Sequence, residues 1–405
     1  MKVKKVVGMN APGALYLTPF PERTLANQRL QIHTEEHLIE HLVSGHALCD
    51  AIVQGVDLAD VLDVLKTRAV SGAVFLGCDA PPACAADLVE RGAAVFPSVD
   101  ERPYDAYRAH LYTADELYAG FDPDHPETLL DTLDSRVYAH WKRTGRERPN
   151  LVESLMRRLH DLAMGDAIAD LVTCETRAVA VMGGHALSRQ DPGFRHVVEI
   201  GRGLAERGFL PVSGGGPGAM EATHLGACLV DKDDAFLDAC LAELETAPLY
   251  DDAGWLSTAM RVRAKIGTIT DRQVSLAVPT WLYGHEPATP FATHIAKYFA
   301  NAVREDGLVT IARHGIIYTP GSAGTVQEVF QDTTQNHYET LGEYSPMVFL
   351  GRTFWTETLP VIPLLEKLGG TRRYLKSVGV VDTPEEALAF IESHPPVRSV
   401  DADKL

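Results

Sequence analysis

Paired cysteines are missing from this chain of 405 residues. None of its six cysteines forms a C-x-x-C pair or has the spacing of a zinc site; they are Cys49, Cys78, Cys84, Cys174, Cys228 and Cys240. Reduced thiols in a cytoplasmic protein are expected, because disulfide frameworks belong to oxidising compartments. Long apolar runs are also missing. No segment reaches about 18 unbroken apolar residues, and the charged start Met1–Lys5 leads into no signal-like stretch, so the sequence predicts no membrane partner.

Positive charge is scarce. The chain has 37 Lys and Arg against 55 Asp and Glu, a net charge of -18. This balance argues against a nucleic-acid partner, because phosphate backbones attract a surplus of cationic side chains. A small phosphorylated ligand needs only a local positive site and stays compatible with it. The sequence also lacks G-x-S-x-G, a Cys/His pairing, a lysine setting typical of pyridoxal and any metal-like spacing of His, Asp and Glu, so we expect no cofactor and no metal.

The length predicts two domains rather than one core. We expect an N-terminal α/β region over residues 1–150, a connecting helix within 151–174 and a nucleotide-binding region over 175–405. In the first region, strands at Gly72–Gly77 and Ala93–Phe96 flank a helix at Ala83–Arg91, which indicates a small parallel unit. No internal repeat is recognisable. The role predicted for this region is regulation or oligomerisation.

The second region alternates strands and helices, which predicts the fold class: α/β, with a doubly wound parallel sheet that binds ligands at the carboxyl ends of its strands. Leu151–Leu171 carries apolar residues at helical spacing, and the acidic segment of about residues 231–252 is expected to be a helical insertion outside the sheet. The predicted strands are Ala178–Met182, Leu210–Ser213, Val274–Val278, Gly315–Tyr318, Met347–Leu350 and Val378–Val381. The predicted helices are Phe194–Arg207, Ala219–Cys228, Phe291–Arg304, Thr325–Tyr338 and Pro384–Ser393.

Glycine-rich turns follow three of these strands, on one edge of the predicted sheet. Glycine lets backbone N–H groups approach a ligand and permits positive φ angles, so we expect a nucleotide there. The candidate binding residues are Gly183, Gly184, His185, Gly214, Gly215, Gly216, Gly218, Met220, Pro320, Gly321, Ser322, Gly324 and Thr325. A dinucleotide site fits less well. Ala219 stands where G-x-G-x-x-G has its third glycine, and no acidic residue ends a second strand about 20 residues later.

The turn Pro320–Glu328 is the most informative of the three. It joins a buried strand to a helix, so unpaired N–H groups and the positive end of the helix dipole favour phosphate. Glu328 lies one helical turn further on. A carboxylate there suits cleavage of an N-glycosidic bond, because it stabilises the positive charge that builds on the ribose. The alternative is a glutamate that only stabilises the helix N-terminus.

The segments G-G-G-P-G-A-M-E at 214–221 and P-G-S-A-G-T-x-x-E at 320–328 resemble the Lonely Guy (LOG) family, also labelled lysine decarboxylase-like. The longer chain resembles the bacterial pyrimidine/purine nucleotide 5′-monophosphate nucleosidases of that family. The resemblance covers about residues 175–395 and implies a cofactor-independent hydrolase acting on a nucleoside monophosphate, with a homodimer or higher homo-oligomer. It also implies a catalytic arginine beside Glu328. Arg304 matches that position, although Glu305 stands where the family commonly has lysine.

Other polar residues leave alternatives open. Arg261 and Arg263 are a second basic pair, expected on a solvated helix face. The segment Trp281–Glu286 offers His285 and Glu286 as pocket wall, and Trp281 and Tyr283 as residues that stack on a base or pack in the core. A non-catalytic nucleotide sensor of the same fold is the alternative function.

Overall fold

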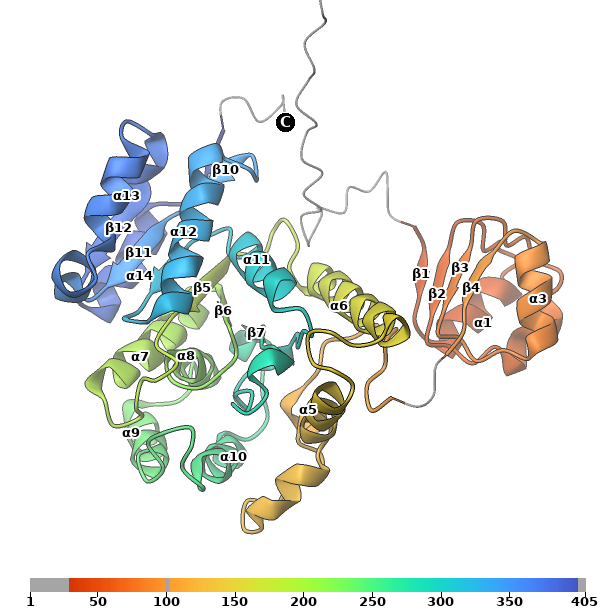
Figure 1. The fold of residues 1–405 in the computed structure, drawn as a ribbon, viewed down its shortest axis with the longest axis horizontal. Coiled ribbons are helices and arrows are strands. Elements are labelled where there is room, and N and C mark those ends of the chain that lie inside the picture. Colours follow the sequence, from red (N-terminus) through yellow and green to blue (C-terminus); the bar gives the residue numbers. More distant parts are fainter. Residues whose placement is uncertain (1–28, 99–101, 400–405) are drawn as a thin grey trace, which may run out of the picture.

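The computed structural model describes residues 29–98 and 102–399, which form two separate parallel sheets (Figure 1). The four strands of the first sheet lie within residues 31–96, and the seven strands of the second lie within residues 178–381. A two-stranded antiparallel ribbon, β10 (Glu343–Tyr344) with β13 (Val397–Arg398), completes the pairing within the described residues. No helix in these two ranges is both long and apolar enough to cross a membrane.

The N-terminal sheet has its strands in sequence order, β1-β2-β3-β4, all parallel. The residues in register, Gln31, Ile52, Val74 and Ala94, lie 21, 22 and 20 residues apart. The unit is therefore a short structural repeat, and no repeat is recognisable in the sequence because equivalent positions, such as Gln31 and Ile52, differ in polarity. Its elements are β1 (Gln31–Ile32), α1 (Glu35–Val43), β2 (Ile52–Gln54), α2 (Leu62–Leu65), β3 (Val74–Leu76), α3 (Pro82–Glu90) and β4 (Ala94–Phe96).

Residues after the gap belong to the core of the larger sheet. Tyr104, Tyr112 and Trp141 pack in the same hydrophobic cluster as the seven-stranded sheet. These side chains join residues 104–141 to the hydrophobic core of the larger sheet. The predicted domain boundary at residue 150 stays a prediction. The helices here are α4 (Ala114–Leu117), α5 (Leu133–Arg143) and α6 (Leu151–Leu171); α6 has the predicted bounds.

The large sheet has the order β12-β11-β9-β5-β6-β7-β8, and every neighbouring pair is parallel. The first strand of this sheet in the sequence is β5, near its centre; β6, β7 and β8 follow on one side of it, and β9, β11 and β12 follow on the other. This order confirms the predicted doubly wound α/β class, and it places the reversal of strand order between β5 and β9. The strands are β5 (Ala178–Met182), β6 (Leu210–Ser213), β7 (Leu276–Ala277), β8 (His294–Ile295), β9 (Ile316–Tyr318), β11 (Met347–Leu350) and β12 (Val378–Val381).

Most predicted helices of this region are present, but the one at Phe291–Arg304 is wrong. That stretch holds β8, whose residues pair with β7 on one side while Ile295 bridges to Tyr112 on the other, so sheet pairing overrides the helical spacing of its apolar residues. The helices are α7 (Pro192–Glu206), α8 (Ala219–Cys228), α9 (Asp234–Leu244), α10 (Trp255–Ile266), α11 (Asn301–Ile311), α12 (Ala323–Tyr338), α13 (Val361–Gly369) and α14 (Pro384–Ser393).

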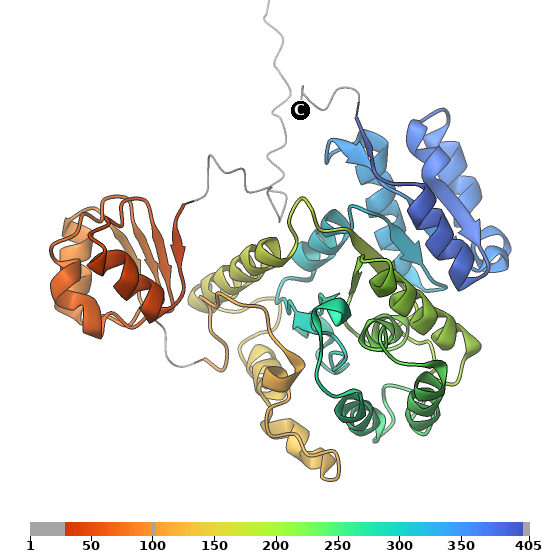
Figure 2. The ribbon, with the colours of Figure 1, turned by 180° about the vertical axis from the view of Figure 1, so that it is seen from behind.

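The N-terminal unit stands beside α6, as the view from behind shows (Figure 2). Gln31 donates a hydrogen bond to Asp166 of α6 over 3.3 Å, and Gln54 donates another to the carbonyl of Tyr107. The acidic insertion is helical as predicted: α9 packs its apolar side into the cluster formed by α7 and α8.

Candidate functional site

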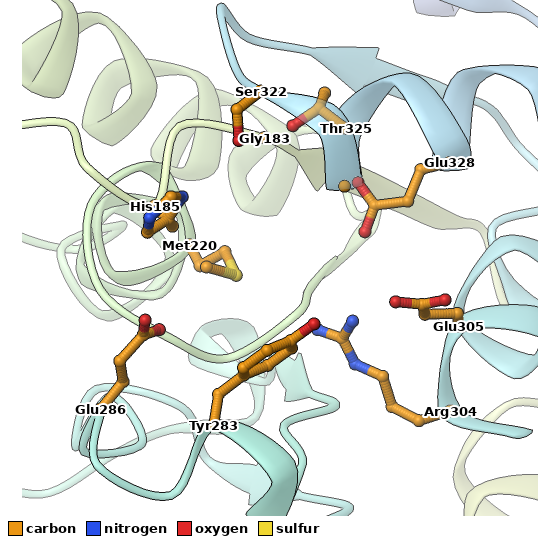
Figure 3. A pocket seen from close by; sticks show the side chains of 11 residues that line it. Gly183, His185, Met220, Tyr283, Glu286, Arg304, Glu305, Ser322, Thr325 and Glu328 are labelled. Atoms are coloured by element: carbon orange, nitrogen blue, oxygen red, sulfur yellow. The ribbon is translucent and has the colours of Figure 1, made fainter. Parts of the chain in front are cut away.

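A pocket of about 230 Å³ opens where the turns after β5 and β9 meet, at the reversal of strand order. Three carboxylates and one guanidinium line it, together with the start of α12 (Figure 3). The lining residues are Gly183, His185, Met220, Tyr283, Glu286, Arg304, Glu305, Ser322, Gly324, Thr325 and Glu328. Eight of the fifteen residues predicted for the site are in this set, namely all but Gly184, Gly214, Gly215, Gly216, Gly218, Pro320 and Gly321.

The N-terminus of α12 faces this pocket without a side-chain cap. Ser322 is the N-cap residue, but its hydroxyl accepts no hydrogen bond from the first turn. By contrast, α14 is closed by a capping box in which Thr383 and Glu386 take up the free N–H groups. Ser322, Gly324 and Thr325 therefore bring an open helix N-terminus to the pocket wall, as an anion site requires.

Gly184 and Gly218, which do not line the pocket, hold the turns after β5 and β6 against one another. Gly218 has a φ of 69°, and a Cβ at this position would come within 2.1 Å of the Gly184 carbonyl oxygen. Gly184 itself has a φ of 63° and would clash with Ala219. Any larger residue would push apart the turns after β5 and β6. The structure shows the close packing of these two glycines, and their direct contact with a ligand stays a prediction.

A buried polar chain fixes the turn after β6. The Ser213 hydroxyl lies 2.8 Å from Nε2 of His224 and accepts a hydrogen bond from the Gly215 N–H at 3.0 Å. Nδ1 of His224 lies 2.9 Å from the Ser275 hydroxyl. Burial lowers the pKa of His224 to about 3, so the imidazole is neutral and acts as a hydrogen-bonding link between β6 and β7.

Glu221 in the same motif forms a buried ion pair with Arg189. Arg189 also donates to the carbonyl oxygens of Ala247 and Trp255. The pair ties the segment after β5 to the α9–α10 region.

Arg304 is only 7% exposed and is held by backbone carbonyls. Its Nε donates to the Val278 carbonyl over 2.6 Å, and Nη2 donates to the Gly214 carbonyl over 3.1 Å. Within the described ranges no acidic side chain forms an ion pair with it, and it lines the pocket together with Glu328. The helix that carries it begins at Asn301, which places Arg304 in the first turn of α11 and not at the end of the helix predicted at 291–304.

Glu328 points into the pocket from α12, near Arg304 (Figure 3). Burial raises the pKa of its carboxyl group to about 7; Arg304 opposes this rise and Glu305 adds to it. A carboxyl group with a pKa near 7 exchanges a proton readily at neutral pH, as a general base or acid must.

Glu305 is a pocket residue that the sequence analysis treated only as a departure from lysine. Its carboxylate accepts hydrogen bonds from Asn301, at 2.7 Å, and from Gln327 of α12. It therefore bridges α11 and α12 beside the two predicted catalytic residues. Its position next to Arg304 in the sequence is the signal that could have identified it.

The segment after β7 supplies the opposite wall. Tyr283 and Glu286 line the pocket, but Trp281 is fully buried, stacks on Phe299 with ring centroids 4.4 Å apart and donates to Asp134. Trp281 is thus a core residue. His285 is exposed and outside the pocket lining.

Arg261 of α10 lies on the surface, as expected, whereas Arg263 is half-buried, with its side chain 24% exposed. Arg261 pairs with Asp124, and Arg263 pairs with Asp115. Among residues 29–98 and 102–399, no group of three or more His, Cys, Asp and Glu side chains is arranged to hold a metal ion.

No family model and no curated protein matches the chain. Several solved structures align with about half of it. The molybdenum cofactor binding protein from the phototrophic bacterium Rippkaea orientalis aligns with a TM-score of 0.34 and 15% identity, over 55% of this chain and 98% of that one. TM1055, a structural-genomics target, gives 0.34 and 20% over 54% and 99%, and the Chlamydomonas rheinhardtii Moco carrier protein gives 0.32 and 14% over 54% and 97%. At these scores the alignments transfer no function, and the α/β class rests on the strand order itself.

Proposed function

We propose that the protein hydrolyses nucleoside 5′-monophosphates to a free base and ribose 5-phosphate. One observation carries the proposal: Glu328, with its pKa raised to about 7, shares a pocket with Arg304 and with the uncapped N-terminus of α12. A phosphate site and a titrating carboxyl group at a fixed separation suit a substrate that carries its phosphate a few bonds from the bond to be broken. The resemblance of the 214–221 and 320–328 segments to the LOG family supports the same reaction.

The phosphate would bind at the start of α12, where N–H groups near Ser322 and Gly324 are free to donate. Binding energy gained there, away from the reacting bond, holds C1′ of the ribose close to Glu328. The net charge of -18 makes such a local site necessary, because the protein as a whole repels an anion.

At C1′ the bond to the base nitrogen breaks, and its electron pair leaves with the base. The ionised Glu328 stabilises the positive charge on C1′ and O4′, then takes a proton from the attacking water as the new C1′–O bond forms. Glu328 then passes this proton to the base nitrogen, directly or through a water molecule, which gives the neutral base and restores the ionised carboxylate. Arg304, fixed by two carbonyls, favours the ionised form of Glu328 and lies where it can donate to the phosphate or to a ribose hydroxyl.

The test is to incubate the purified protein with a panel of nucleoside monophosphates and to assay free base and ribose 5-phosphate. We expect release from at least one nucleotide. Glu328→Gln should lower kcat by about 100-fold or more while binding persists, because the amide keeps the shape and loses the charge. Glu366→Gln, at an exposed position on α13, is the matched control. Nucleotide binding without release in the wild-type protein would favour the sensor and end the hydrolase proposal.

A further inference from the structure

Glu286 is a pocket carboxylate for which the hydrolytic step has no use. Its side chain is 15% exposed and accepts no hydrogen bond from any part of the chain that the structure describes. The nearest cation is the imidazole of His285, with Nε2 at 3.8 Å from Oε1, and that side chain is 58% exposed. Solvent reaches the carboxylate oxygens of Glu286 from the pocket, so donors on a bound ligand can replace water there.

The surroundings of Glu286 suit a flat, partly apolar group. Met220 and Tyr283 line the same part of the pocket, and Tyr283 is 44% exposed, which leaves ring surface for stacking. Gly216 adds space: a Cβ there would come within 2.9 Å of the Met220 methyl and 3.8 Å of Oε2 of Glu286. A side chain at residue 216 would therefore crowd the part of the pocket that Glu286 faces.

Glu286 also lies at the end of the pocket away from the anion site. Figure 3 shows its carboxylate across the cavity from Ser322 and Thr325, with Arg304 and Glu328 on a third side. A nucleotide with its phosphate at α12 and its ribose beside Glu328 would extend its base toward Met220 and Glu286. We propose that Glu286 selects the base, and that the preferred base is guanine; this inference rests on the proposed hydrolysis of nucleotides.

Guanine follows from the chemistry of a carboxylate. Its ring N1–H and its exocyclic amino group are adjacent donors on one edge, and the two oxygens of Glu286 can accept both in parallel. Adenine presents an acceptor nitrogen beside its amino group. Uracil presents one N–H between two carbonyl oxygens, which would repel the carboxylate. Two matched charge-assisted hydrogen bonds should give a preference of about 10- to 100-fold over the wrong base.

The experiment compares kcat/KM for GMP, AMP and UMP in the wild type, Glu286→Gln and Glu286→Asp. We expect the wild type to prefer GMP by about 10- to 100-fold, and Glu286→Gln to lose most of that preference through GMP alone. His285→Gln is the control, since His285 is the exposed neighbour of Glu286, and it should keep the wild-type ratios. Thermal melting of each variant shows that the fold persists.

Calorimetric binding of the same nucleotides to Glu328→Gln separates this inference from the proposed function. Hydrolysis without a GMP preference, or a preference that survives Glu286→Gln, overturns the role of Glu286 and leaves the hydrolase intact. If no nucleotide is hydrolysed, the proposed function fails, and the binding data still decide whether Glu286 selects guanine. Equal binding of GMP and UMP would overturn it there.

Discussion

Glu328 has to be ionised to stabilise positive charge on the ribose, and its pKa is raised to about 7 by burial. The fraction of the active form therefore increases as the pH rises through 7. We expect log kcat/KM to rise with a slope of one below about pH 7 and to level off above it. Glu305→Gln should move this midpoint to lower pH, because the Glu305 charge contributes to the raised pKa. An acidic limb with an unshifted midpoint in that variant would show that another group controls the rate.

Asp332 lies one turn beyond Glu328, is fully buried, and accepts hydrogen bonds from Tyr318 and Asn336, each over 2.9 Å. Burial raises its pKa from 3.8 to about 7, against the effect of those two hydrogen bonds. Between these values the folded protein holds a proton that the unfolded chain has released. The free energy of unfolding should therefore fall by about 1.4 kcal/mol per pH unit between about pH 4 and 7 from this group alone.

Asp332→Asn should remove this part of the pH dependence, because the amide can accept from Asn336 and donate to Tyr318 without titrating. Urea unfolding at several pH values between 4 and 8 measures the slope in each protein. Glu328→Gln is the comparison, since Glu328 titrates in the same range. The same slope in Asp332→Asn as in the wild type would show that Asp332 is already ionised in the folded protein.

At the scale of elements, α6 determines where Arg304 lies. Asp161 of α6 is 3% exposed and accepts the backbone N–H groups of Phe299, at 2.9 Å, and Ala300, at 2.8 Å, at the start of α11. Asp161→Ala removes the acceptor from the buried N–H of Phe299 and the part-buried N–H of Ala300, which should lower the free energy of unfolding by about 3 kcal/mol. It should also lower kcat/KM by displacing Arg304. Asp161→Asn, which keeps an acceptor, should do less of both; an activity unaffected by Asp161→Ala would separate α11 from the catalytic machinery.

Elements with a strong local pattern were predictable from the sequence. The buried strands Ala178–Met182 and Met347–Leu350, and the helix Leu151–Leu171, have the predicted bounds because period and composition agree there. The segment 291–300 was not predictable, since its conformation depends on β7 and on Tyr112, which is distant in the sequence. At the site, Glu286 lines the pocket as its place in the segment after Trp281 predicted, whereas Glu305 was not predicted as a lining residue, because its place depends on how α11 packs beside α12.

At the scale of the whole molecule, the described residues form two units with separate hydrophobic cores. One cluster is confined to residues 32–93, and the clusters of the large sheet begin at Tyr104. The small unit has strands of only two or three residues, so we expect it to unfold separately and at a lower temperature. Scanning calorimetry should show two transitions.

Ribose 5-phosphate at 100 times its Kd should stabilise the larger unit alone, by about 2.7 kcal/mol, because the ligand binds only the unit that contains the pocket. Arg304→Ala should reduce this shift. A single transition that moves as a whole with ligand would instead mean that the contacts of Gln31 and Gln54 with the larger unit couple the two cores.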